Sequence, residues 1–154
     1  GQQRMFLDGE DGSEAIRMPQ ISICASDVSS LPAVRSFLLE MQRKLAREHN
    51  VVMDGRDIGT VVLPDADLKI FLTASAEQRA KRRMLELEAK GVDASFDEVL
   101  KDIEYRDDQD TKRAAAPLRA AEDAVRVDTS SLNFEESAAV LAGLVIDRLS
   151  PKQE

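Results

Sequence analysis

The tetrapeptide Asp54-Gly55-Arg56-Asp57 contains the residue types in this sequence that are best suited to chemistry. It ends a short apolar run that begins at Val51 and that we expect to form a buried strand. An apolar strand ending in aspartate is the Walker B arrangement, in which the carboxylate helps to hold Mg²⁺ or its waters. Arg56 suits a phosphate because its planar guanidinium binds two oxygens at once. A plain turn with a local ion pair is the alternative, and a tetrapeptide alone leaves both interpretations open.

A second charged stretch runs from Arg106 to Arg113 and contains Asp107, Asp108 and Asp110. One interpretation is a lid whose arginines stabilise charge on transferring phosphates while its closure excludes water. The other is a solvated helix face with compensating charges, which is what charge runs usually form. Spacing alone favours the solvated face.

Arginines at positions 79, 82 and 83 form a third basic group. Arg79 shares a helix face with Arg82 and Arg83, because residues three and four apart are neighbours on a helix. An outer basic face is the favoured interpretation for Arg83, and a nucleotide contact stays open for Arg79 or Arg82. We interpret His49 as a dipole-compensating or exposed group and Cys24 as a small buried residue rather than a nucleophile.

The composition indicates a globular protein and excludes some classes of partner. Its 154 residues have a net charge of -8, 4% aromatic residues and no Trp. A nucleic-acid binder needs a basic face or aromatic stacking platforms, so we expect no nucleic-acid partner. No apolar run approaches the roughly 18 residues of a membrane span, so we expect no membrane association. One cysteine and the lack of an apolar leader favour a cytoplasmic location.

The elements that must position these groups alternate between strands and helices. The first thirty residues are predicted to be irregular, with a turn at Asp8-Gly9. Predicted helices span 32–49, 76–90, 95–104 and 134–149, and predicted strands span 51–54, 68–73 and 124–128. Ser75, Ser95 and Asn133 are the predicted N-caps. This alternation predicts an α/β fold with a parallel sheet.

Segments spread along the whole chain match one known family in the same order. They are 51–66, 68–75, 106–108, 116–118 and 122–124, preceded by 7–11, 14–17 and 34–35. Together they resemble the bacterial cytidylate kinase family. Because the matching motifs are collinear and cover nearly all of the chain, the alternatives based on single motifs lose weight.

The resemblance implies a fold, a reaction and a division of the chain. The fold is that of the P-loop nucleoside monophosphate kinases, a parallel sheet flanked by helices with an NMP-binding insert and a lid. The insert would include 1–30, the core 31–94 and 120–154, and the lid region 95–119. The implied reaction is phosphoryl transfer from ATP to CMP or dCMP, giving ADP and CDP or dCDP, with Mg²⁺ as cofactor in a monomeric enzyme.

The resemblance also implies residues that read the cytosine base. By position, Ser26, Arg35 and Asp57 match the residues that contact the base edge. Cytosine presents an amine donor beside two acceptors, so a carboxylate and an arginine can address both sides. Uracil has a carbonyl in place of that amine and would face Asp57 unfavourably.

The remaining implied contacts involve the sugar, the phosphates and the metal. Arg106 and Asp110 match the sugar-binding pair, and Arg56 and Arg113 match phosphate-binding arginines. Arg56, Arg106 and Arg113 would be the catalytic residues, because phosphoryl transfer depends on charge stabilisation. Asp54 matches the acid that lies near Mg²⁺, which we expect it to contact through water.

A P-loop needs a Gly-Lys pair for its phosphate cradle, and this pair occurs nowhere in the 154 residues. We therefore expect the P-loop and the first strand of the sheet to lie outside this chain. Alone, the chain should be inactive, and it should be unstable or self-associate through unpaired strand edges. Two alternatives stay open: a kinase for another nucleoside monophosphate, and a non-catalytic nucleotide-binding or self-associating module.

Overall fold

The computed structural model describes residues 4–17, 21, 24–25, 28, 31–112 and 116–150. The chain divides into two compact units, Gly1–Val51 and Val52–Glu154. The first unit contains strands β1 (Phe6–Leu7) and β2 (Glu10–Asp11), the short helix η1 (Ala15–Arg17) and helix α2 (Pro32–Glu48). Cys24 is exposed, so its interpretation as a buried apolar residue was wrong.

Strands β1 and β2 form an antiparallel hairpin around the turn at Asp8-Gly9. Both turn residues have positive φ, 51° at Asp8 and 87° at Gly9. Type I′ hairpin turns, whose twist matches that of their strands, need positive φ at both central positions, and Asp-Gly is a preferred pair there. The turn prediction is therefore confirmed, whereas the prediction of irregular structure throughout the first thirty residues was wrong. Two-residue strands are too short to show an alternating pattern in the sequence.

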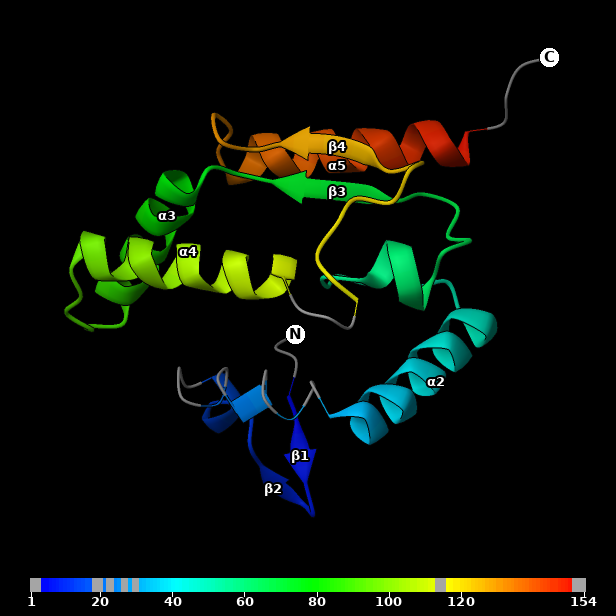
Figure 1. Ribbon diagram of the computed structural model, residues 1–154, viewed down its shortest axis with the longest axis horizontal. Coiled ribbons are helices and arrows are strands. Elements are labelled where there is room, and N and C mark those ends of the chain that lie inside the picture. The colour runs from blue at the N-terminus through cyan, green and yellow to red at the C-terminus, as the bar shows by residue number, and fades with distance from the viewer. Residues whose placement is uncertain are drawn as a thin grey trace. The chain divides into compact units, whose positions relative to one another are not determined.

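The second unit is mixed α/β and mainly helical. It contains η2 (Ile58–Val62), β3 (Ile70–Thr73), α3 (Ala76–Ala89), α4 (Phe96–Lys112), β4 (Val125–Asp128) and α5 (Phe134–Leu149). Strands β3 and β4 run side by side in the same direction, as Figure 1 shows. Their register places Ile70 opposite Val125 and Thr73 opposite Asp128. The predicted parallel pairing is confirmed for this two-stranded sheet.

Residues 51–54 form no strand, which corrects the prediction of a buried strand ending at Asp54. The side chain of Val52 is fully exposed, with a relative accessibility of 100%. A strand exists only where a neighbour supplies backbone hydrogen bonds. Among the described residues no strand pairs with this segment, so its apolar pattern does not produce one.

The helix caps follow local sequence signals. Asn133 and Glu136 form a reciprocal capping box at the start of α5, and Ser75 accepts the N–H of Gln78 at the start of α3. Ser95 and Glu98 bond reciprocally before α4, as predicted. Helix α4 nevertheless runs to Lys112, well beyond the predicted end near residue 104. The charged stretch 106–112 therefore lies on a helix.

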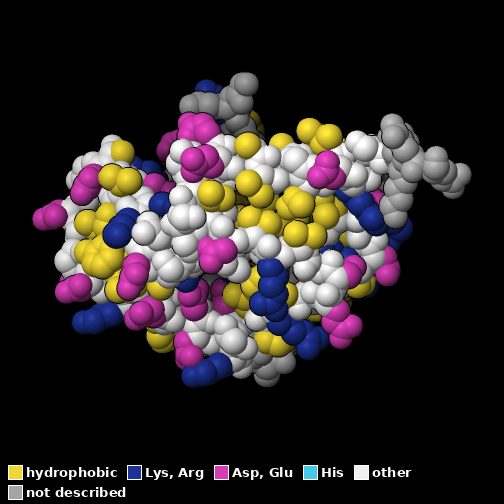
Figure 2. All heavy atoms as spheres, turned by 90° about the horizontal axis from the view of Figure 1, so that it is seen from above, with side chains coloured by type: hydrophobic (Ala, Val, Ile, Leu, Met, Phe, Trp, Pro, Cys, Tyr) yellow, Lys and Arg dark blue, Asp and Glu magenta, His cyan; other side chains and the backbone are white. Residues whose placement is uncertain are grey.

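The apolar core of the second unit lies between helices α3 and α4. Ala80, Leu87 and Val99 are buried there. Many other hydrophobic side chains reach the surface, and several groups of them are visible on the face shown in Figure 2. Within the described part of the chain, no helix is both long enough and apolar enough to cross a membrane.

Candidate functional site

The loop that contains Arg56 is shaped by glycine and by a π-helical turn. A Cβ atom on Gly55 would lie 2.9 Å from Cγ1 of Ile58, so only glycine fits at this position without a shift. The carbonyl oxygen of Asp57 accepts the N–H of Val62 at 3.2 Å and opens η2. Single π-helical turns often occur at functional sites. Close packing and backbone bonding therefore define the chain path on either side of Arg56.

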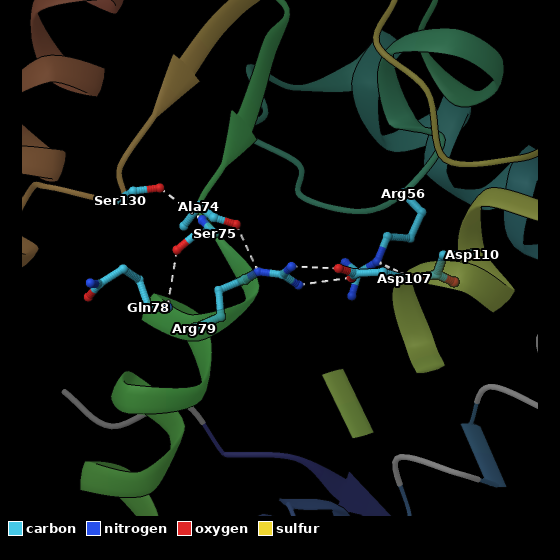
Figure 3. A network of polar contacts seen from close by, with 8 residues as sticks. All are labelled: Arg56, Ala74, Ser75, Gln78, Arg79, Asp107, Asp110 and Ser130. Carbon is cyan, nitrogen blue, oxygen red and sulfur yellow. Dashed lines mark hydrogen bonds and ion pairs between the residues drawn. The ribbon is translucent and has the colours of Figure 1, made fainter. Parts of the chain in front are cut away.

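Arg56 reaches from this loop to helix α4. Its Nε donates to Oδ2 of Asp110 at 2.8 Å, a contact drawn in Figure 3. The Asp110 side chain is 26% exposed and that of Arg56 is 59% exposed. Arg106 is exposed and lies four positions before Asp110, on the same face of α4. The structure thus brings together a residue from each charged stretch that the sequence singled out.

Lys69 packs against η2 and bonds the segment that follows it, and sequence reasoning missed this residue. Its side chain is only 10% exposed, and its Nζ donates to both carboxylate oxygens of Asp123 at 2.8 and 2.7 Å and to the carbonyl of Pro64. The hydrogen bond from Lys69 lowers the pKa of Asp123. A Cβ atom on Gly59 would lie 3.3 Å from Cδ of Lys69, so the lysine stem packs closely on η2. No sequence signal marked this pair, whose members lie 54 positions apart.

The arginines at 79, 82 and 83 have separate partners. Arg79 donates from Nη1 and Nη2 to the two oxygens of Asp107 at 2.8 and 2.5 Å, and from Nε to the carbonyl of Ala74 at 3.0 Å (Figure 3). The hydrogen bond with Asp107 raises the pKa of Arg79. Arg83 pairs with Glu86 on its own helix, which supports the outer-face interpretation. Arg82 donates to backbone carbonyls that follow β4, at positions 129 and 132.

Serine and threonine side chains link the carboxyl ends of β3 and β4. The hydroxyl of Thr129, which is 3% exposed, donates to the carbonyl of Thr73 at 3.1 Å. The N–H of Ser75 donates to Oγ of Ser130 at 2.8 Å, and that hydroxyl donates to Oδ1 of Asp128 at 2.5 Å. Hydrogen bonds from Ser130 lower the pKa of Asp128. These contacts fix the loops at the end of the sheet where open α/β folds bind ligands.

Of the other predicted site residues, Ser26 and Arg113 lie outside the described residues. Arg35 lies half-buried on α2 in the first unit, and Asp54 is exposed at the start of the loop. No group of three or more potential metal ligands occurs among the described residues. A single carboxylate still fits Mg²⁺, which keeps several waters and takes other ligands from substrate phosphates.

Comparison with known proteins gives a consistent result. The family profile described as cytidylate kinase matches residues 1–145. Cytidylate kinase from Caldicellulosiruptor bescii is 57% identical over 136 residues, which cover 88% of this chain and 60% of that protein. The Carboxydothermus hydrogenoformans enzyme of the same name is 52% identical over 143 residues, covering 93% and 64%. The chain thus spans about three-fifths of the length of these relatives. It belongs to the cytidylate kinase family.

Proposed function

We propose that the protein carrying this chain transfers the γ-phosphoryl group of ATP to the phosphate of CMP or dCMP. A phosphate oxygen of the monophosphate forms a bond to the γ-phosphorus while the bond from that phosphorus to ADP breaks. Little covalent chemistry falls to the protein in such reactions, so positioning and charge stabilisation dominate. The observation that carries the proposal is the contact between Arg56 and Asp110 in a chain of this family.

The contact between Arg56 and Asp110 supports a division of roles between phosphate and sugar. Arg56, together with Arg113, would bind phosphate oxygens, and Arg106 and Asp110 would bind the sugar. The Nε–H of Arg56 donates to the Asp110 carboxylate. A phosphate competes for the same planar fork, because both anions match its geometry. In this proposal Arg56 binds the phosphate while Asp110, beside it, accepts from the sugar hydroxyls.

The base would be read by Asp57, Arg35 and Ser26. In this proposal the Asp57 carboxylate accepts a hydrogen bond from the exocyclic amine of cytosine. Mg²⁺ would be held beside Asp54 through water and, when bound, would neutralise charge on the transferring phosphates. In this arrangement the part of the sheet seen here belongs to a P-loop nucleoside monophosphate kinase fold. Its core would span 31–94 and 120–154, the lid 95–119, and the monophosphate-binding insert would include 1–30.

Base selectivity tests the proposal most directly. Asp57→Ala should weaken CMP binding by roughly 1.5–3 kcal/mol, the value of a hydrogen bond to a charged group, and should barely change UMP binding. Isothermal titration with each nucleotide measures both affinities. Asp65→Ala is the matched control, because Asp65 is an exposed acid in the loop that follows η2. An unchanged ratio of CMP to UMP affinity in Asp57→Ala would remove Asp57 from base recognition.

Phosphoryl transfer itself is tested by a coupled assay for ADP production with CMP and ATP. Arg56→Ala should lower kcat/KM by at least a factor of ten, since a charge-assisted contact to phosphate is lost. Arg83→Ala should leave the rate unchanged, because Arg83 pairs only with Glu86 among the described residues. Equal rates in Arg56→Ala and the unsubstituted protein would refute the assigned role of Arg56.

A further inference from the structure

The second half of helix α4 has little apolar anchorage of its own. The hydrophobic side chains of α4 that pack on the core end at Ile103. Beyond it Tyr105 is the one large hydrophobic residue, and it is 66% exposed. The residues from 104 to 112 are otherwise charged or polar. Polar contacts must therefore set the position of this half of the helix.

One such contact ties α4 to the junction of β3 and α3. All three nitrogen groups of the Arg79 guanidinium donate hydrogen bonds, two to Asp107 and one to the carbonyl of Ala74. Ala74 directly follows β3, and Arg79 lies in the first turns of α3. A bidentate pair between guanidinium and carboxylate fixes orientation as well as distance. Arg79 therefore fixes the turn of α4 that carries Asp107 relative to the end of the sheet.

The same turn of α4 carries the residues of the candidate site. Asp107 follows Arg106 directly and lies three positions before Asp110, so Asp107 and Asp110 are neighbours along the helix surface. Figure 3 shows Arg79 and Arg56 both extending to this part of α4, one from α3 and one from the 54–57 loop. A second support comes from the N–H of Leu118, which donates to the Asp110 carbonyl at 2.8 Å.

We propose that Arg79 and Asp107 are positioning residues that hold the polar half of α4 so that Arg106 and Asp110 stay aligned with Arg56. The identity of the substrate rests on the proposed function, whereas the alignment of α4 does not. The side chains of Arg79 and Asp107 are 36% and 44% exposed. A partly exposed ion pair contributes little to overall stability. Its loss should therefore appear in the alignment of the site rather than in the melting temperature.

The alignment can be followed without any substrate through the Nε–H signal of Arg56 in nuclear magnetic resonance spectra. This group is hydrogen-bonded to Asp110, so its proton should exchange slowly with water. Arg56→Lys assigns the signal, and Asp110→Asn shows its position when the charged partner is lost. Arg79→Lys keeps the charge at 79 but loses the planar two-pronged contact. We expect Arg79→Lys and Asp107→Asn to shift the Arg56 signal and speed its exchange, while both variants retain the fold.

The matched control is Arg83→Lys, four positions along the same helix, where the arginine pairs locally with Glu86. It should leave the Arg56 signal unchanged. In the protein that carries this chain, Arg79→Lys and Asp107→Asn should each weaken CMP binding roughly 5–30-fold, and the double variant should be no weaker than either one. Arg83→Lys should bind CMP normally.

The outcomes separate this inference from the proposed function. If the Arg56 signal is the same in Arg79→Lys, Asp107→Asn and the control, the positioning role is overturned, even where CMP binds tightly. If the signal responds but no cytidine nucleotide binds, the alignment of α4 is supported and the proposed substrate is wrong. Should Asp107→Asn fail to fold, the conservative Arg79→Lys variant decides the question alone.

Discussion

Helices α3 and α4 and strands β3 and β4 differ in how far they bury their apolar side chains. Between the helices, Ala80 has an exposed fraction of 0% and Leu87 of 9%. In the strands, Val127 is buried at 8%, whereas Leu72 is 53% exposed. Parallel strands are normally covered on both faces, and of the residues in this strand pair only Val127 is buried. The helix pair completes a small core from residues near in sequence, and the sheet does not.

The largest expected effect comes from Leu87→Ala, because a buried leucine leaves a cavity. The substitution should lower the free energy of unfolding by about 2–5 kcal/mol. Leu85→Ala, two positions away on the same helix and 66% exposed, is the control and should change it by less than about 0.5 kcal/mol. Urea denaturation followed by circular dichroism measures both. Equal losses in the two variants would mean that α3 does not pack on α4 by the face described.

A smaller effect is expected at the end of the sheet, from Thr129→Val. The substitution keeps the shape of the side chain and removes its hydroxyl, which donates to Thr73 and accepts from Arg82 at 3.3 Å. The Thr73 carbonyl still accepts the N–H of Thr129, so no backbone group is left unpaired. We expect a loss of about 0.5–1.5 kcal/mol, the usual net value of such a hydrogen bond. The same denaturation experiment on Thr111→Val, at an exposed position of α4, should show no comparable loss.

Leu72→Ala in β3 is the strand counterpart of Leu87→Ala in α3. A half-exposed leucine gives up only part of the transfer free energy of a buried one and leaves no closed cavity. The loss should therefore stay below about 1 kcal/mol, well under that of Leu87→Ala. A loss as large as that of Leu87→Ala would show that the outer face of β3 is covered in solution.

The same contrast explains what the sequence predicted. The caps at Ser75, Ser95 and Asn133 and the starts of their helices depend on residues within one turn, so local pattern was sufficient. Strands β3 and β4 were also predicted, because both are short segments rich in strand-forming residues and each is followed by a helix cap. The segment 51–54 has an equally apolar run, but a strand also needs a neighbour, which a local pattern does not reveal. The end of α4 was placed too early because its last turns lack apolar periodicity.

For the candidate site, too, some features could be predicted from the sequence and others could not. Residue type and spacing marked Arg56 and the stretch that includes Asp110 as chemically interesting, and the family resemblance proposed their roles. Neither signal indicated that these two side chains meet, or that Arg79 holds Asp107. Both pairs join positions that lie far apart in the sequence, 54 and 28 residues respectively. Such contacts follow from the packing of α3 against α4 and the path of the 54–57 loop, which only the fold specifies.

The smallest effect concerns pH and the cap of α4. The hydroxyl and the N–H of Ser95 donate to one oxygen of Glu98, and these hydrogen bonds lower the pKa of Glu98 below its usual 4.5. A carboxyl group whose pKa is lowered by folding stabilises the folded state above its unfolded pKa, and this contribution disappears as the pH falls through the folded value. Glu98→Gln removes the titrating group and keeps an acceptor. The stability difference between wild type and Glu98→Gln should therefore be constant above about pH 5 and shrink below pH 4.5.

Thermal melts between pH 3 and 7 measure this stability difference. Ser95→Ala should reduce the same pH dependence because it removes one of the two donors. Parallel pH profiles for wild type and Glu98→Gln would show that the cap does not hold Glu98 in its charged form.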